Sequence, residues 1–267
     1  MVSSDGFFHW VGVLINEYGV FFLEGAGATL LLALVGTLIG CIIGLLVGVL
    51  RTIPLDPNAN LTKKIFYKIL QFILAAYIEI FRGTPMIVQA MVVYYGSMQL
   101  FGIDMSAMFA GFLVVSINTG AYMAETVRGG IDSIDIGQTE AAKAIGMTHW
   151  QTMISVIMPQ TIRNIMPQIG NNLIINIKDT SVLNVISVTE LYFEAKSAAG
   201  VYYRYFEAFF IISVMYFVMT FTCSRLLRWI EHKIDGSSYY SLVKSDMMAD
   251  PTGHNPVKQG GNGTWKK

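Results

Sequence analysis

Long apolar segments, separated by shorter segments that carry charge, run along the 267-residue chain. Residues 25–50 contain no charged side chain, and residues 28–50 rise about 35 Å as a helix, enough to cross the hydrocarbon core of a bilayer. Further candidate spans follow at residues 108–127, at residues 165–188, which are unusually polar for a span, and at residues 208–224. The pattern therefore predicts an all-α, polytopic membrane protein.

Glycine recurs at every fourth position of the first span, at Gly36, Gly40, Gly44 and Gly48. Residues four apart lie on the same face of a helix. Small residues at this spacing let the backbone of a second helix approach closely. We expect this stripe to be a packing face of the first span.

The second apolar region, residues 69–101, is interrupted at Pro85. Proline removes a backbone donor and its ring clashes with the preceding turn, so the helix must break or kink there. Glu79 and Arg82 lie three residues apart, about one helical turn, just before the break. We expect a local ion pair between them, with pore lining as the alternative.

The distribution of Lys and Arg between the spans predicts the topology. If the second region is one broken span, the chain has five spans. Residues 51–68, residues 128–163 and the segment after residue 224 then carry basic residues on one side, whereas residues 97–107 carry none. The positive-inside rule places the N-terminus outside and the C-terminus in the cytosol of a plasma-membrane protein.

The two ends of the chain differ from its centre. Residues 1–24 contain no Lys or Arg, so they lack the basic region of a signal peptide and are expected to be an interfacial lead-in to the first span. Residues 25–235 are expected to form the transmembrane domain. Residues 236–267 are rich in Gly, Ser, Asn and Pro with scattered Lys, which is typical of a disordered tail, here cytosolic.

Composition agrees with a membrane protein and excludes several other classes. Hydrophobic residues make up 54% and charged residues 13%, and the mean hydropathy is +0.53. A soluble domain has about 25% charged residues. The 18 basic and 18 acidic residues balance, which argues against a nucleic-acid partner. The four histidines and two cysteines show no metal-ligand spacing, and no catalytic motif or phosphate-binding loop occurs, so we expect neither catalytic residues nor a metal site.

The fourth span carries a polar face. On a helical wheel, seven side chains fall within an arc of about 160°; they are Asn164, Gln168, Asn171, Asn172, Asn176, Lys178 and Asp179. Such a face must turn to water or to other polar helices. It either lines a substrate pathway or forms hydrogen bonds between helices, and both roles are compatible. Asn118 and Tyr122, four apart on the third span, are expected to face the same space.

A short helix is predicted in the loop between the third and fourth spans. Glu140-Ala141-Ala142 is followed by Gly146, with Asp135 or Thr139 available as a helix cap. Gly146 is suited to the left-handed turn that ends many helices. From these residues alone, an ordinary interfacial helix is the simplest interpretation.

The same residues resemble the EAA signature of permease subunits of ATP-binding-cassette importers, which continues here with Val156, Met158 and Pro159. Several further stretches are similar to the polar-amino-acid branch of that family, among them Arg82-Gly83-Thr84-Pro85 with Gln89, and Lys178-Asp179-Thr180-Ser181. The resemblance extends from about Gly25 to Ile234.

This resemblance implies a transport machine rather than an enzyme. It implies that Glu140, Ala141, Ala142 and Gly146 couple the permease to two ATP-binding subunits, which bind the ATP, so the chain needs no cofactor of its own. It also implies a second permease subunit, identical or related, and an extracytoplasmic substrate-binding protein. A polar amino acid would pass along Asn118, Tyr122, Gln168, Asn172, Asn176 and Asp179. An autonomous channel or secondary transporter is the alternative function, and a membrane enzyme is a more distant one.

Overall fold

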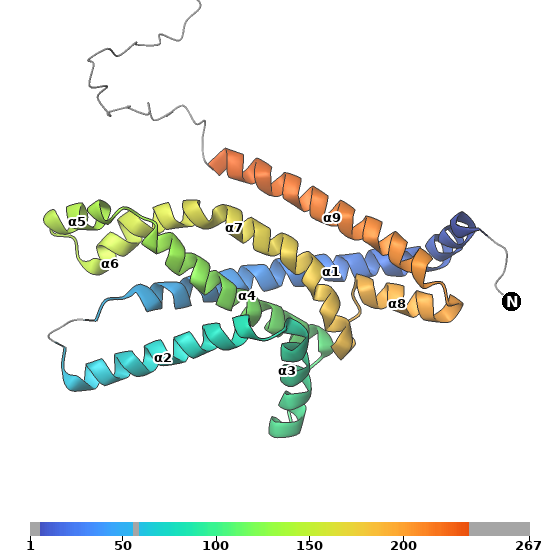
Figure 1. The fold of residues 1–267 in the computed structure, drawn as a ribbon, viewed down its shortest axis with the longest axis horizontal. Coiled ribbons are helices and arrows are strands. Elements are labelled where there is room, and N and C mark those ends of the chain that lie inside the picture. The colour runs from blue at the N-terminus through green and yellow to red at the C-terminus, as the bar shows by residue number, and fades with distance from the viewer. Residues whose placement is uncertain (1–5, 56–58, 235–267) are drawn as a thin grey trace, which may run out of the picture.

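The computed structural model describes residues 6–55 and 59–234, and all secondary structure in these residues is helical (Figure 1). The α-helices are α1 (Phe7–Thr52), α2 (Leu61–Gly83), α3 (Met86–Phe101), α4 (Ala107–Asp132), α5 (Ile136–Ala144), α6 (His149–Thr152), α7 (Met158–Asp179), α8 (Leu191–Tyr202) and α9 (Tyr205–Ile234). A π-helical turn, η1 (Met153–Ile157), joins α6 to α7, and a 3-10 segment, η2 (Thr180–Ile186), follows α7. The all-α expectation is confirmed for the described residues.

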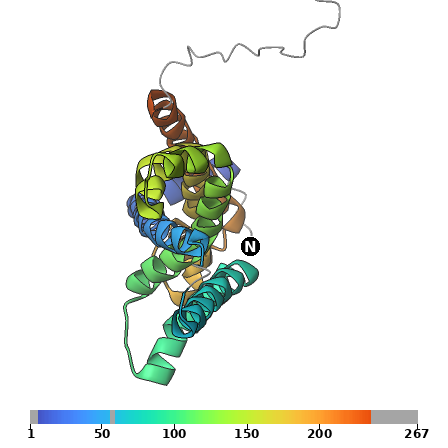
Figure 2. The same ribbon diagram turned by 90° about the vertical axis from the view of Figure 1, so that its left-hand side faces the viewer.

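Helices α1 and α4 form the centre of the bundle, and the glycine stripe explains their close approach. A Cβ atom on Gly40 would lie 2.6 Å from Cβ of Thr119, and one on Gly48 would lie 2.8 Å from the carbonyl oxygen of Ala124. These distances are too short for real side chains, so glycine is required along this face. The predicted packing face is confirmed. Helices α9 and α2 lie on opposite sides of this central pair (Figure 2).

Three helices, α1, α4 and α9, are long and apolar enough to cross a membrane. Helix α1 begins at Phe7, so residues 7–24, expected as a lead-in, continue the same helix as the first span. Buried Leu14 and Phe22 pack this part of α1 against α8 and α9. The count of five spans stays a prediction, and residues 236–267 lie outside the described residues.

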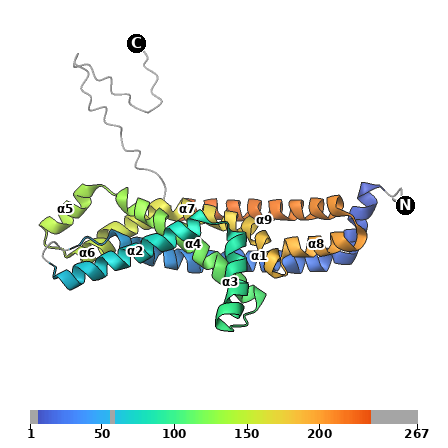
Figure 3. The same ribbon diagram turned by 60° about the horizontal axis from the view of Figure 1, so that its bottom comes forward.

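The break at Pro85 is confirmed. Helix α2 ends at Gly83, Thr84 is extended, and Pro85 is the N-cap of α3 with φ −64°. This φ is the value that the proline ring imposes. Helix α3 leaves the bundle in a direction of its own (Figures 1 and 3), so α2 and α3 are two separately directed helices. The break thereby places Thr84 and Pro85 beside α4 and α7.

Candidate translocation cavity and coupling segment

A cavity of about 440 Å³ lies where the α2–α3 break meets α4 and α7. All six residues predicted for the substrate pathway line it, namely Asn118 and Tyr122 from α4 and Gln168, Asn172, Asn176 and Asp179 from α7. The other lining residues are Thr84, Pro85, Met86, Thr119 and Ile175. The structure therefore brings the predicted residues together around one space.

Asn176 belongs to a buried polar cluster as well as to the cavity wall. Its amide nitrogen donates to Oγ1 of Thr37 on α1, at 2.8 Å, and to Oγ1 of Thr119 on α4, at 2.9 Å. The three side chains are only 6%, 4% and 2% exposed, respectively. Asn176 thus joins three helices, which is the inter-helix role that the sequence left open beside pathway lining.

Asn172 also connects α7 to α4, although through a weaker hydrogen bond. Its amide nitrogen donates to the sulfur of Met123 on α4, at 3.2 Å, and to the backbone oxygen of Gln168, at 3.1 Å. A thioether is a poor acceptor, so the contact with Met123 adds little. For Asn172 and Asn176 alike, the amide nitrogens are occupied within the protein, and both side chains still line the cavity.

A second amide cluster holds the break between α2 and α3. The amide nitrogen of Gln89 donates to the backbone oxygens of Phe81 and Thr84, both at 2.9 Å, and Asn118 donates to the side-chain oxygen of Gln89 at 3.0 Å. These contacts satisfy carbonyls that the end of α2 leaves without helical partners. Pattern reasoning gave Gln89 no role, because its partners come from the break itself and from α4.

The predicted ion pair between Glu79 and Arg82 is wrong. Among the described residues the two side chains form no ion pair, and the guanidinium of Arg82 instead lies 5.6 Å from the centre of the Tyr122 ring. A cation over an aromatic face is attracted by the ring quadrupole. The ring comes from α4, so the spacing within α2 could not reveal it. Arg82 therefore stands beside the cavity wall, because Tyr122 is part of that wall.

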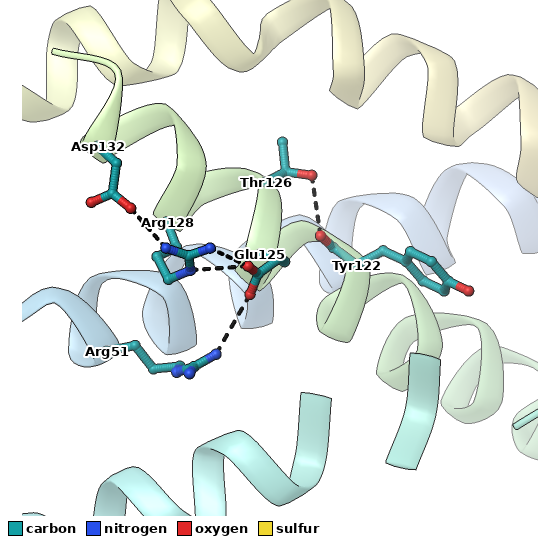
Figure 4. A network of polar contacts seen from close by, with 6 residues as sticks. All are labelled: Arg51, Tyr122, Glu125, Thr126, Arg128 and Asp132. Carbon is teal, nitrogen blue, oxygen red and sulfur yellow. Dashed lines mark hydrogen bonds and ion pairs between the residues drawn. The ribbon is translucent and has the colours of Figure 1, made fainter. Parts of the chain in front are cut away.

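Further along α4 than Tyr122, charged side chains form a network with the end of α1 (Figure 4). Arg128 donates from Nε to Glu125 at 3.0 Å and from Nη1 to Asp132 at 2.7 Å. Arg51, in the last turn of α1, lies 3.5 Å from the other oxygen of Glu125. The network fixes the end of α1 against the part of α4 that leads into α5.

The predicted coupling segment is a capped helix. Asp135 accepts a hydrogen bond from the backbone N–H of Gly137, and α5 extends from Ile136 to Ala144. Gly146 has φ +84°, and the N–H groups of Gly146 and Met147 donate to the oxygens of Lys143 and Ala142 at 3.0 Å each. These two bonds form a Schellman motif, which confirms the left-handed turn predicted for Gly146.

The predicted coupling segment, residues 136–146, is followed after a short turn by the helical segment that lines the cavity. Thr148 begins α6 with a capping box to Gln151. Helix α6, the π-helical turn and α7 then follow without an intervening loop, from His149 to Asp179. Glu140 and Ala141 are exposed on α5, whereas Ala142 is buried. An exposed helix is thus joined through a continuous helical segment to the residues around the cavity.

A helical membrane bundle with an amide-lined cavity defines the class as a membrane transport subunit. The chain belongs to the family described as "Binding-protein-dependent transport system inner membrane component", whose model matches residues 61–236. The membership confirms the resemblance found in the EAA signature.

Individual relatives agree with the family. The chain is 33% identical over 158 residues to the arginine transport system permease protein ArtQ of Bacillus subtilis, covering 59% of this chain and 72% of ArtQ. It is 30% identical over 158 residues to the putative glutamine transport system permease protein GlnP of Rickettsia felis, with the same two coverages. Among solved structures, the crystal structure of an amino acid ABC transporter with histidines is 38% identical, with a TM-score of 0.72, and covers 82% of this chain and 96% of that one.

Proposed function

We propose that this permease subunit imports polar amino acids across the plasma membrane and is driven by ATP hydrolysis in separate subunits. The observation that carries the proposal is the connection of an exposed, capped EAA helix to an amide-lined cavity by one continuous helical segment. The names of the relatives, which include arginine and glutamine permease proteins, support amino acids as the substrate class.

The lining of the cavity suits a zwitterionic molecule such as an amino acid. Amide and hydroxyl groups act as donors and as acceptors, so they serve an ammonium and a carboxylate alike. Hydrogen bonds of this kind are individually modest, which permits release after binding. The amide nitrogens of Asn172 and Asn176 are engaged, but their carbonyl oxygens accept no hydrogen bond from the described residues and are available to substrate.

The proposed partners follow from the coupling segment. Glu140, Ala141, Ala142 and Gly146 would dock on one of two ATP-binding subunits, which supply the nucleotide site. A second permease subunit, identical or related, would cover the exposed part of the polar face of α7, since amides cannot face lipid without partners. An extracytoplasmic binding protein would deliver substrate on the side of the N-terminus, which we place outside, with the C-terminus in the cytosol.

Movement of the docked helix would reach the cavity through α7. A π-helical turn is less regular than an α-helix and frequently occurs at functional sites. The turn at Met153–Ile157 lies between the coupling segment and the cavity. ATP binding would shift α5 and α6, and α7 would then move relative to α4, opening the cavity to one side of the membrane at a time.

Reconstitution of the purified complete importer into liposomes tests the proposal. Uptake of radiolabelled amino acids is expected only when ATP is present on the side of the ATP-binding subunits. The matched control is the same complex with Gly146→Val, which strains the turn at φ +84° and should lose uptake while the chain still inserts. Uptake by this chain alone, without ATP, would instead identify an autonomous channel or secondary transporter.

A further inference from the structure

Another polar cavity, of about 220 Å³, lies between α7 and the last turns of α9 and shares no residue with the translocation cavity. Its lining includes Gly170, Asn171 and Ile174 from α7 and Leu227, Arg228 and Glu231 from α9. A Cβ atom on Gly170 would lie 3.3 Å from Cδ1 of Leu227 and 3.4 Å from Oε1 of Glu231. The absence of a side chain at Gly170 therefore keeps this space, the α7–α9 groove, open.

The two charged side chains of the groove have no charged partner. Arg228 donates from Nε to the backbone oxygen of Ser224, at 3.2 Å, but its two terminal nitrogens donate no hydrogen bond to the described residues. Across the described part of the chain neither Arg228 nor Glu231 forms an ion pair, although they lie three residues apart on one helix. The side-chain amide of Asn171 also forms no hydrogen bond within those residues. A cation, an anion and an amide thus face one groove and can bind a ligand.

The position of the groove along α9 is that of the lipid headgroups. Helix α9 is long and apolar enough to cross a membrane, and residues 208–224 carry no charge. At 1.5 Å per residue, Arg228 and Glu231 lie about 6 Å and about 10 Å beyond the end of this uncharged segment. The polar layer on each side of the hydrocarbon core is about 5–8 Å thick, so Arg228 lies within it and Glu231 at its outer edge. Trp229 is exposed beside them with Lys233 over its ring, and both residue types are common at this level.

The order of the two charges along α9 matches the order of charges in a zwitterionic phospholipid. In phosphatidylethanolamine the phosphate lies nearer the acyl chains and the ammonium lies farther out. Two carbon atoms join these groups, so standard bond lengths place the phosphorus and the nitrogen about 4–5 Å apart. Arg228 lies on the hydrocarbon side of Glu231, and the helix separates the two residues by about 4.5 Å along its axis. A phosphate at Arg228 therefore brings the ammonium to the level of Glu231.

We propose that the α7–α9 groove binds the headgroup of phosphatidylethanolamine, with Arg228 binding the phosphate and Glu231 together with Asn171 binding the ammonium. A guanidinium can hold a phosphate through two parallel hydrogen bonds. An ammonium donates three hydrogen bonds, and the carboxylate and the amide oxygen accept them. An anionic headgroup such as that of phosphatidylglycerol would satisfy Arg228 but leave Glu231 without a cation. Phosphatidylcholine has a cation whose nitrogen carries no hydrogen to donate.

Lipid binding to the detergent-purified complete importer, measured by native mass spectrometry, tests this assignment. Phosphatidylethanolamine, phosphatidylglycerol and phosphatidylcholine are compared with identical acyl chains, so that only the headgroup differs. The wild type is expected to bind phosphatidylethanolamine at least fivefold more tightly than either of the other two lipids. Equal binding of the three lipids, or tighter binding of phosphatidylglycerol, would overturn the proposal.

Substitutions assign the two charges to the two ends of the headgroup. Arg228→Gln should weaken the binding of phosphatidylethanolamine about tenfold, as expected for the loss of a hydrogen bond to a charged group. Glu231→Gln should remove the preference for phosphatidylethanolamine over phosphatidylglycerol. This preference compares two lipids on the same protein, so a change in yield or folding does not alter it.

Arg225→Gln is the matched control for Arg228→Gln. It removes the same charge from the same end of α9, but Arg225 lies over the ring of Phe221 and does not line the groove. The control should bind all three lipids as the wild type does. An equal loss in Arg225→Gln and Arg228→Gln would indicate a general attraction to the basic end of α9 and overturn the proposal. Unchanged binding in both Arg228→Gln and Glu231→Gln would mean that no lipid occupies the groove, as when a second permease subunit covers it, and would overturn the proposal as well.

Discussion

Replacing Asn176 by Leu separates the two roles that the polar face of α7 combines. The substitution removes the hydrogen bonds from Asn176 to Thr37 and Thr119, which are 2.8 and 2.9 Å long and lie in the centre of the bundle. Hydrogen bonds between membrane helices contribute about 0.6 kcal/mol on average and about 1.7 kcal/mol at most. Two of them give an expected loss of roughly 1–3 kcal/mol of stability. The two threonine oxygens accept these bonds and lose them, but each hydroxyl can still donate to a carbonyl of its own helix, which favours the lower end of that range.

Gln168→Leu is the matched comparison, because Gln168 lines the same cavity and its side chain makes no bond within the described residues. Thermal unfolding of the detergent-purified complex measures stability, and binding of a radiolabelled amino acid measures function. Asn176→Leu should unfold at lower temperature than the wild type, and Gln168→Leu should keep wild-type stability while binding less. Wild-type stability of Asn176→Leu, or equal destabilisation by both substitutions, would refute the division of the polar face into packing and ligand-binding groups.

Three further outcomes are expected. Gly40→Ala should lower the stability by about 1–3 kcal/mol, because its Cβ would lie 2.6 Å from Cβ of Thr119 on α4. Gly27→Ala is the control, because its Cβ would have no atom within 4 Å, and it should keep wild-type stability. Equal stability of the two variants would contradict the close packing of α1 and α4. Gly146→Val should abolish substrate-stimulated ATP hydrolysis while insertion in the membrane persists, and normal stimulation would contradict the coupling role. In a cysteine-free background, Ser97→Cys should react with an impermeant thiol reagent added outside and Thr148→Cys should not, and the reverse pattern would contradict the proposed orientation.

Local features of the structure were predictable because few residues determine them. Proline fixes its own φ and disfavours the helix before it, which predicted the break at Pro85, although Pro167 lies within α7 without ending that helix. Gly146 ends α5 for a similarly local reason, since its left-handed turn needs only the last residues of the helix. The four-residue spacing of Gly40 and its equivalents predicted a packing face, although not that α4 would be the partner.

Contacts between helices distant in sequence were not predictable in the same way. Arg82 lies over Tyr122 because α4 packs beside the break, and a pairing within α2 was the only contact that spacing offered. The wheel placed Asn176 and Gln168 on one face of α7, which the cavity confirms. The helical wheel could not show that Asn176 donates a hydrogen bond to Thr37 while the side chain of Gln168 has no partner among the described residues. That difference depends on the register of α7 against α1.

The extent of α1 shows the same limit. Aromatic and acidic residues before Gly25 suggested a separate lead-in, but the segment contains no proline to end a helix. Leu14 and Phe22 are buried against α8 and α9, elements more than 160 residues later in the chain. Tertiary packing thus extends the helix to Phe7, and the sequence near the N-terminus contains no local signal for it.

Protection of a cysteine in the cavity by substrate tests the central claim most directly. In the complete importer lacking Cys41 and Cys223, Gln168→Cys should react with a thiol reagent, and an imported amino acid should slow that reaction at concentrations that support uptake. Ile174→Cys, which lies outside the cavity on the same helix, should react at a rate that the amino acid does not change. Labelling of Gln168→Cys at the same rate with and without substrate, in a complex that imports that amino acid, would contradict passage through this cavity.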